Sequence, residues 1–229
     1  RKWQAAYLGT LAVNKKLESP MITEKNFILK AKYDTTACFY DILDYPWERT
    51  YKKWRPGLVG DLRGKVLEAG VGTGRNLAFY HESVELVGID LSEPMLRKAN
   101  KRIKNCKCNV NLFNEDATSM ASIDSNQFDW IYSTFMCCVI PNELQEQAIQ
   151  QFCRVLKPGG RFRLLEMVFS KNKKIRKRQE FFSPFVEKVF GARFDRETLH
   201  YLEQSSGLEV TSTSFLKDDV YLLIEGICK

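Results

Sequence analysis

Short apolar runs alternate with amphipathic stretches along most of the sequence. The runs predict strands at 65–69, 84–89, 109–114, 128–135 and 161–168, with helices between them at 74–81, after Ser92 and at 142–156. Strands that alternate with helices form a mostly parallel sheet. Two further runs, 208–215 and 220–227, flank Lys217-Asp-Asp219 and predict an antiparallel hairpin at the end of the sheet. The pattern therefore predicts an α/β fold.

The region before residue 65 has a weaker pattern. Residues 1–32 form an N-terminal extension that could be an arm over the domain, a membrane-contacting segment or a poorly ordered leader. Residues 33–57 favour a helix that Asp34 can cap. Its apolar stripe consists of Phe39, Ile42 and Leu43. Residues that disfavour helices then follow and are expected to break the helical pattern: Pro46, Pro56 and Gly57.

The junction after the first predicted strand carries the strongest chemical signal. Glycines at alternate positions, Gly70, Gly72 and Gly74, let a ligand lie against the main chain. Nucleotide-binding α/β folds place their ligand at such a strand–turn–helix junction. Arg75 stands where a dinucleotide fingerprint needs glycine or alanine, and no P-loop lysine follows. Glu68, two residues before the first glycine, suits a cationic ligand better than a pyrophosphate.

Together with Asp90, which follows the second predicted strand, this turn resembles that of class I S-adenosylmethionine-dependent methyltransferases. Further motifs of that family are Asp116-Ala117, the Phe-Asp-x-Ile opening at 128–131 and the Leu-Lys-Pro-Gly-Gly turn at 156–160. The small-molecule and lipid methyltransferases are closest in pattern, including the ubiquinone/menaquinone C-methyltransferases and the phospholipid N-methyltransferases. The resemblance covers 33–229. It implies a Rossmann-like seven-stranded sheet with a C-terminal antiparallel hairpin, and S-adenosyl-L-methionine as cofactor.

The resemblance also implies which residues form the site. Cofactor contacts are expected from Tyr33, Glu68, Gly70, Gly72, Thr73, Gly74, Asn76, Asp90, Leu91, Met95, Asp116, Ala117 and Ser133. Asp90 would accept the ribose hydroxyls and Asp116 the adenine amine, while Glu68 would fix the turn or reach the ammonium group. Ser133 to Met136 would lie under the sulfonium and beside the substrate. Tyr40 and His200 are the candidate catalytic residues, and His200 would be a general base. Tyr33 and Tyr40 would close over the cofactor or line the substrate mouth, unless they only pack on the helix.

Two absences narrow the acceptor. Ser133-Thr-Phe-Met136 lacks the Asn/Asp-Pro-Pro-Tyr/Phe motif of amino-directed DNA and RNA methyltransferases, and Cys137 lacks the preceding proline of cytosine C5 enzymes. We therefore interpret Cys137 and Cys138 as buried packing residues. The sulfonium already activates the methyl group, so the protein mainly has to align donor and acceptor, and no metal site is expected. We predict methyl transfer to a small-molecule or lipid-like acceptor, such as a quinone precursor or a phospholipid headgroup. An RNA-directed methyltransferase and a non-catalytic binding or assembly subunit are the alternatives.

The stretch 169–206 would form a substrate-side insertion. Six of the eight residues at 171–178 are basic, and phenylalanines at near-helical spacing follow as far as Phe190. This composition suits an anionic membrane surface, a pocket for a prenylated or acyl substrate, or a core-facing helix with a solvated basic end. The net charge of +7 likewise allows an anionic partner, either nucleic acid or membrane, or only aids solubility.

Size and cysteine content set the remaining expectations. The 229 residues suit one domain with its own core, a methyltransferase domain at 33–229. The closely spaced cysteines among the seven favour free thiols in a reducing intracellular compartment. Because the sequence begins with Arg1, that compartment could be the cytoplasm, or the mitochondrial matrix if a presequence was removed, with peripheral membrane association as a further option. The oligomeric state stays open.

Overall fold

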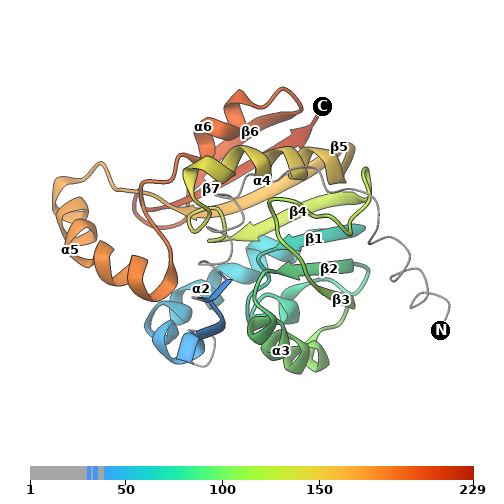
Figure 1. Ribbon diagram of the computed structural model, residues 1–229, viewed down its shortest axis with the longest axis horizontal. Coiled ribbons are helices and arrows are strands. Elements are labelled where there is room, and N and C mark those ends of the chain that lie inside the picture. The colour runs from blue at the N-terminus through green and yellow to red at the C-terminus, as the bar shows by residue number, and fades with distance from the viewer. Residues whose placement is uncertain (1–29, 32, 36–38) are drawn as a thin grey trace.

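One mixed sheet organises the protein. The computed structural model describes residues 30–31, 33–35 and 39–229, so predictions on 1–29 and on Cys38 lie outside the described residues. The strands are β1 (Lys65–Ala69), β2 (Glu85–Asp90), β3 (Asn109–Asn114), β4 (Phe128–Thr134), β5 (Leu156–Met167), β6 (Leu208–Phe215) and β7 (Tyr221–Cys228). Their order is β3-β2-β1-β4-β5-β7-β6, and β7 lies antiparallel between β5 and β6 (Figure 1). The predicted sheet and its antiparallel hairpin are confirmed.

Helices cover both faces of the sheet because both faces of the central strands are apolar. On one face, α2 (Tyr45–Val59) and α3 (Glu93–Arg102) contribute Leu58 and Leu96 to a buried cluster around Val66 and Leu86. On the other face lie α4 (Asn142–Val155) and α6 (Thr198–Gln204). Their side chains, among them Phe152 and Leu202, pack on Leu67 and Ile131. Central parallel strands buried on both sides are expected to be apolar throughout.

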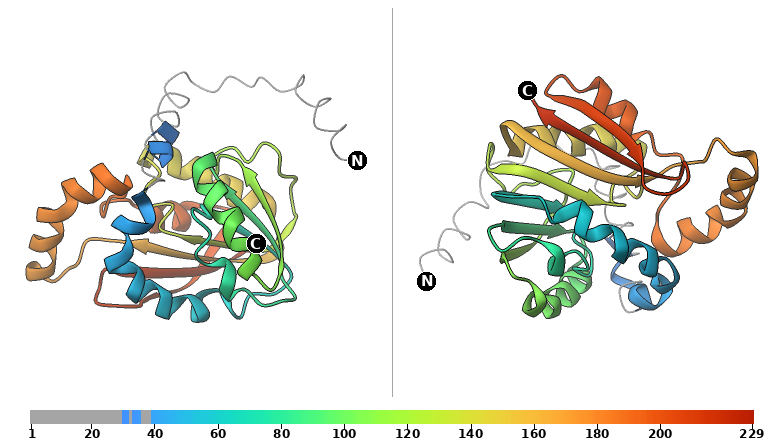
Figure 2. Two further views of the ribbon diagram at one scale, coloured as in Figure 1. Left: turned by 90° about the horizontal axis from the view of Figure 1, so that it is seen from below. Right: turned by 180° about the vertical axis from the view of Figure 1, so that it is seen from behind.

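The helix α5 (Lys173–Phe190) departs from this layered arrangement. It extends beyond the sheet and returns toward the N-terminal helices (Figures 1 and 2). Gln179 is its one buried residue. The helix ends at Gly191 in the left-handed conformation, a common helix stop. Its position leaves most of its surface in water.

Two sequence predictions about local structure need correction, and the first of them is wrong. The predicted helix at 74–81 is only a 3-10 turn, η1 (Leu77–Phe79), because Asn76 and Tyr80 turn inward to bind the Glu68 carboxylate and the chain becomes extended at Tyr80. The turn predicted at 156–160 falls inside β5, which starts at Leu156, but as an irregularity of that strand: Gly159 has φ +74°, and regular pairing with β4 resumes at Arg161, the predicted start of the strand.

The predicted helix breaks at Pro56 and Gly57 are also wrong, since α2 continues through both residues. The break predicted at Pro46 is present just before it, at Asp44. Pro46 lies in the first turn, where a missing N–H costs nothing. Pro56 lies in the last turn, and burial of the following Leu58 and Val59 offsets its cost. Residues 39–43 form a separate helical segment, and a turn at Asp44 separates it from α2.

Candidate functional site

A pocket lies at the carboxyl ends of β1, β2 and β4, the edge at which open α/β sheets bind ligands. Its lining includes nine of the fifteen residues assigned to the site from the sequence: Tyr33, Tyr40, Gly70, Gly72, Asp90, Leu91, Met95, Asp116 and Ala117. They come from the N-terminal segment (the described residues from 33 to 48), the glycine turn, the end of β2, the start of α3 and the loop after β3. The structure thus brings together residues far apart in the sequence, while their cofactor-binding roles stay predictions.

The glycine turn combines an open position with a closed one. A Cβ on Gly72, at φ +54°, would have no atom within 4 Å, so the backbone is bare toward the pocket. A Cβ on Gly74, at φ +78°, would lie 2.9 Å from the Cα of Ala99 in α3. Gly74 therefore serves close packing of the turn against α3, whereas Gly72 leaves room for a ligand beside the main chain.

Asp90 ends β2 and organises the adjoining loops. Its carboxylate accepts hydrogen bonds from the backbone N–H groups of Gly72 (2.8 Å) and Ser92 (2.9 Å). Burial raises the pKa of Asp90 to about 6, against the opposing effect of these two hydrogen bonds. Each carboxylate oxygen can accept more than one hydrogen bond, so Asp90 keeps capacity for hydroxyl donors in the pocket.

Glu68 lies beneath the turn rather than in the pocket lining. Its fully buried carboxylate accepts hydrogen bonds from Asn76 (2.6 Å) and from the Tyr80 hydroxyl (3.0 Å). Burial raises the pKa of Glu68 to about 7. Of the two roles predicted for this residue, the contacts fit the one in which it fixes the turn.

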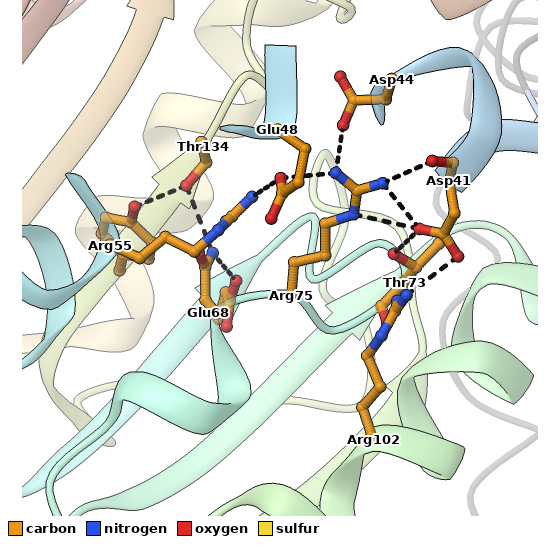
Figure 3. A network of polar contacts seen from close by, with 11 residues as sticks. Asp41, Asp44, Glu48, Arg55, Glu68, Thr73, Arg75, Arg102 and Thr134 are labelled. Atoms are coloured by element: carbon orange, nitrogen blue, oxygen red, sulfur yellow. Dashed lines mark hydrogen bonds and ion pairs between the residues drawn. The ribbon is translucent and has the colours of Figure 1, made fainter. Parts of the chain in front are cut away.

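An ion-pair network joins the turn to the N-terminal segment (Figure 3). Arg75 donates to Glu48 (2.5 Å), Asp44 (2.7 Å) and Asp41 (3.1 Å). Burial raises the pKa of Asp44 to about 6 even though Arg75 opposes this shift. The arginine that breaks the dinucleotide fingerprint thus binds three acids on residues 41–48.

Two further arginines extend this network. Arg102 of α3 pairs with Asp41 and donates to the Thr73 carbonyl, and Asp41 also accepts from the Thr73 hydroxyl. Arg55 of α2 pairs with Glu48 (2.6 Å) and donates to the Asn76 side chain. The N-terminal segment is therefore tied to both the glycine turn and α3.

Six residues assigned to the site from the sequence do not line the pocket: Glu68, Thr73, Gly74, Asn76, Ser133 and His200. Thr73 and Asn76 have their side chains engaged in the network, and Ser133 is fully buried in β4. His200 is exposed on α6. Its predicted role as a general base has no support from its position.

The sequence-based site covered only part of the wall at the end of β4. The stretch from Ser133 to Met136 was expected beside the cofactor and the substrate, and Thr134, Phe135 and Met136 do line the pocket, whereas Ser133 does not. Neighbouring residues of a strand point to opposite faces, so alternation could have favoured Thr134 over Ser133. Val139 and Ile140, in the loop that follows, were missed.

A buried carboxylate holds the loop that carries this apolar wall. Glu166 of β5 accepts hydrogen bonds from the backbone N–H groups of Cys137 (3.1 Å) and Cys138 (2.7 Å). Burial raises the pKa of Glu166 to about 7. Cys137 and Cys138 are both fully buried, as predicted, and burial raises the pKa of each thiol. The cysteines within 39–229 are free, and the described residues contain no cluster suited to a metal ion.

Comparison with known proteins identifies the family. A profile of the methyltransferase domain matches residues 66–160. A ubiquinone/menaquinone biosynthesis C-methyltransferase of Yersinia enterocolitica is 31% identical over 175 residues, which cover 73% of this chain and 66% of the relative. The corresponding protein of Syntrophotalea carbinolica is 33% identical over 143 residues, covering 58% of this chain and 59% of the relative. The chain belongs to the class I S-adenosylmethionine-dependent methyltransferases. It spans less than two thirds of the length of these two relatives.

Solved methyltransferase structures share the fold. One is geranyl diphosphate C-methyltransferase from Streptomyces coelicolor, in complex with Mg²⁺, geranyl diphosphate and S-adenosyl-L-homocysteine. It superposes with a TM-score of 0.63 at 13% identity, and the match covers 80% of this chain and 82% of that protein's chain. A methyltransferase from Methanosarcina mazei gives a TM-score of 0.57 at 18% identity, and the match covers 72% of this chain and 92% of that protein's chain. At these identities the similarity shows the fold alone.

The residues of the pocket fit the cofactor of this family, S-adenosyl-L-methionine. The bare backbone at Gly72 leaves space that a Cβ would fill, and Asp90 offers a carboxylate to hydroxyl groups. Asp116 and Met95 line the same pocket from the loop after β3 and from α3. A polar wall of this kind, opposite the apolar residues after β4, suits a nucleoside beside a less polar acceptor.

Proposed function

We propose that this protein transfers the methyl group of S-adenosylmethionine to a small-molecule acceptor of the quinone-precursor or lipid-like class. One observation carries the proposal: a single pocket joins the polar wall at Gly72 and Asp90 to an apolar wall formed by Phe135, Met136 and Ile140. The related proteins of Yersinia and Syntrophotalea are C-methyltransferases of quinone biosynthesis, which supports an acceptor of this class.

The bound sulfonium would supply an activated methyl group, so the residues of the chain have to bind, orient and exclude water. Asp90 and the turn hold the nucleoside end, and the wall after β4 holds the acceptor. Burial raises the pKa of Tyr40, which therefore keeps its proton at neutral pH. Tyr40 can then donate a hydrogen bond to an oxygen of the acceptor, but it does not act as the base.

Calorimetric titration with S-adenosylmethionine and S-adenosylhomocysteine tests the cofactor site. We expect both to bind the wild-type chain. Asp90→Ala should weaken binding by about ten-fold to a hundred-fold, since a buried hydrogen-bond acceptor is lost. Asp124→Ala, at an exposed loop position, is the matched control and should bind like wild type. Equal affinities for Asp90→Ala and Asp124→Ala would remove Asp90 from the site.

Transfer of a labelled methyl group tests the acceptor class. Label should appear in the organic phase when the chain is incubated with lipid extracts or quinone precursors, and Tyr40→Phe should lower kcat with little effect on cofactor affinity. Label recovered in RNA would favour the RNA-directed alternative. Cofactor binding without transfer to any of these acceptors would favour a non-catalytic subunit.

A further inference from the structure

The outer face of α5 combines exposed aromatic rings with basic side chains. Phe181, Phe182 and Phe185 are 78%, 53% and 48% exposed. Of the three alternatives left open for this stretch, the core-facing helix is therefore excluded for these phenylalanines. Large aromatic side chains seldom remain this exposed in a group without a binding partner.

The helix places the rings and the cations in one stripe. Residues three or four positions apart lie on the same face of a helix, and this spacing joins Lys174, Arg178, Phe181, Phe185 and Lys188 in sequence. All five are exposed. The stripe therefore presents aromatic rings between positive charges.

The acidic residues of α5 lie outside this stripe. Glu180 pairs with Arg176 (3.0 Å), and Glu187 pairs with Arg193 after the helix (3.0 Å). Since 180 and 187 are seven residues apart, both lie on one side of the helix, away from the line through 174, 178, 181 and 185. No acidic side chain within α5 neutralises the stripe.

Ring contacts connect this surface to the pocket. Phe185 lies 6.5 Å from Phe190, which packs edge-on against Tyr40 (5.7 Å) and Trp47 (6.0 Å). The Tyr33 hydroxyl donates to the Phe190 carbonyl (2.8 Å). Because Tyr33 and Tyr40 line the pocket, the end of α5 forms part of the support of the pocket wall.

The N-terminal segment has exposed apolar side chains of its own. Next to Tyr40 and Trp47 in the sequence, Phe39, Ile42 and Tyr45 are 62%, 70% and 65% exposed. No helix among the described residues has the length and hydropathy to cross a bilayer. An apolar area bordered by cations but without a spanning helix has the properties of a surface that inserts shallowly into lipid headgroups.

We propose that the outer face of α5, with the adjoining apolar residues of the N-terminal segment, binds the surface of an anionic phospholipid bilayer. Positive charge complements the lipid headgroups, and the phenylalanines enter the boundary between headgroups and acyl chains. The inference deepens the proposed function, because the contact of Phe190 with the pocket wall brings the site near the membrane that would hold a lipid-like acceptor.

Co-sedimentation of the full chain with vesicles tests this surface. The vesicles are phosphatidylcholine alone or phosphatidylcholine mixed with phosphatidylglycerol. We expect binding to the mixed vesicles that weakens as salt is raised. The triple variant Lys174→Glu, Lys177→Glu, Arg178→Glu should bind about a hundred-fold more weakly, at about five-fold per basic residue. The double variant Phe181→Ser, Phe185→Ser should lose about ten-fold or more.

Matched variants on other surfaces control for net charge and hydropathy. Lys101→Glu, Lys104→Glu, Lys107→Glu changes the charge equally at exposed positions in and after α3. Phe113→Ser, Phe215→Ser changes two phenylalanines that are each 47% exposed, on β3 and β6. Both controls should sediment with the mixed vesicles as wild type does. Equal losses in the controls and the α5 variants, or equal binding to both kinds of vesicle, would overturn the proposal.

Two further outcomes are decisive. Failure to sediment with either vesicle, together with binding of an RNA oligonucleotide that the basic triple variant abolishes, would assign the surface to nucleic acid. Titration with S-adenosylhomocysteine should give wild-type affinity for the two charge variants and for Phe113→Ser, Phe215→Ser, none of which changes a residue in contact with the pocket wall. Since sedimentation needs no turnover, vesicle binding by a chain that does not bind the cofactor would sustain this surface while the proposed function fails.

Discussion

The pocket has two walls that are held in different ways. Backbone hydrogen bonds and close packing hold the wall at the strand ends, whereas side-chain ion pairs and ring contacts hold the wall formed by the N-terminal segment. Asp90 holds two main-chain N–H groups, and Gly74 leaves no space between the turn and α3. Across the pocket, Arg75 and Phe190 connect segments distant in the sequence. The first wall is general to a nucleoside-binding sheet, while the second depends on individual side chains of this chain. Substitutions can therefore disrupt the two walls separately.

The largest effect is expected from Gly74→Ala on the strand side. The added Cβ would be held at φ +78°, 2.8 Å from the Leu77 Cδ1 and 2.9 Å from the Ala99 Cα. Backbone strain and overpacking together should lower the free energy of unfolding by about 2–6 kcal/mol, measured by urea denaturation. Gly72→Ala, with strain but no close atom, should cost only about 1–2 kcal/mol. Similar costs for both would show that packing on α3 contributes little.

The buried carboxyls on the strand side should make stability depend on pH. Glu68 has a pKa of about 7 in the folded chain, raised by burial, against 4.5 ordinarily. The folded state then holds the proton more tightly than the unfolded chain, so this stabilisation is complete below pH 4.5 and is lost as the pH rises through about 7. The loss is up to about 3 kcal/mol.

Glu68→Gln isolates this contribution. A glutamine can accept from Asn76 through its oxygen and donate to the Tyr80 hydroxyl, so the contacts are kept without a titrating group. Urea denaturation between pH 4.5 and pH 8 should show a smaller decrease in stability for the variant than for wild type. A decrease as steep as that of wild type would mean that Glu68 does not contribute to the pH dependence.

A smaller effect is expected on the other wall from Arg75→Gln. The substitution leaves Asp41, Asp44 and Glu48 close together without their shared cation. Because these carboxylates are partly exposed, we expect a loss of about 2 kcal/mol, less than for a fully buried pair. Faster tryptic cleavage at Lys52 and Lys53, which are exposed on α2, should accompany it.

The same substitution at Arg176 is the control. Arg176 and Glu180 form an exposed pair on α5, with side chains 50% and 53% exposed. Arg176→Gln should change stability by about 0.5 kcal/mol or less. Stability and cleavage of Arg75→Gln equal to those of Arg176→Gln would show that the network does not hold the N-terminal segment.

The strand side was largely predictable because its signals are local. Apolar runs located the strands, and short motifs at the glycine turn, at the end of β2 with the start of α3, and at Asp116-Ala117 placed seven of the nine predicted pocket residues on this side. The predicted helix at 74–81 failed because two side chains of that stretch are committed to Glu68. Helical periodicity alone does not reveal such a tertiary contact.

On the other wall, Tyr33 and Tyr40 were predicted to line the pocket and do so, but the contacts that hold this wall could not be predicted from local patterns. Arg75 pairs with acids some thirty positions earlier in the sequence, and the Tyr33 hydroxyl donates to the carbonyl of Phe190, 157 positions later. The phenylalanine spacing of α5 indicated a helix with an apolar face. Periodicity alone does not show whether that face packs on the rest of the protein or stays exposed. Its exposure became visible only once the helix was seen to extend beyond the sheet.

The placement of β7 has a consequence for how the chain folds. β5 pairs with β7 from Arg161 to Met167, with Leu164 opposite Ile224, so this partner strand is synthesised only after α5, α6 and β6. Until then β5 is an open edge whose apolar residues are ready to pair with another chain. Contacts between such distant segments form slowly, and incomplete chains of this kind are prone to aggregation. Early folding of α4 against β5 would shield one face of that strand, but its edge stays uncovered until β7 arrives.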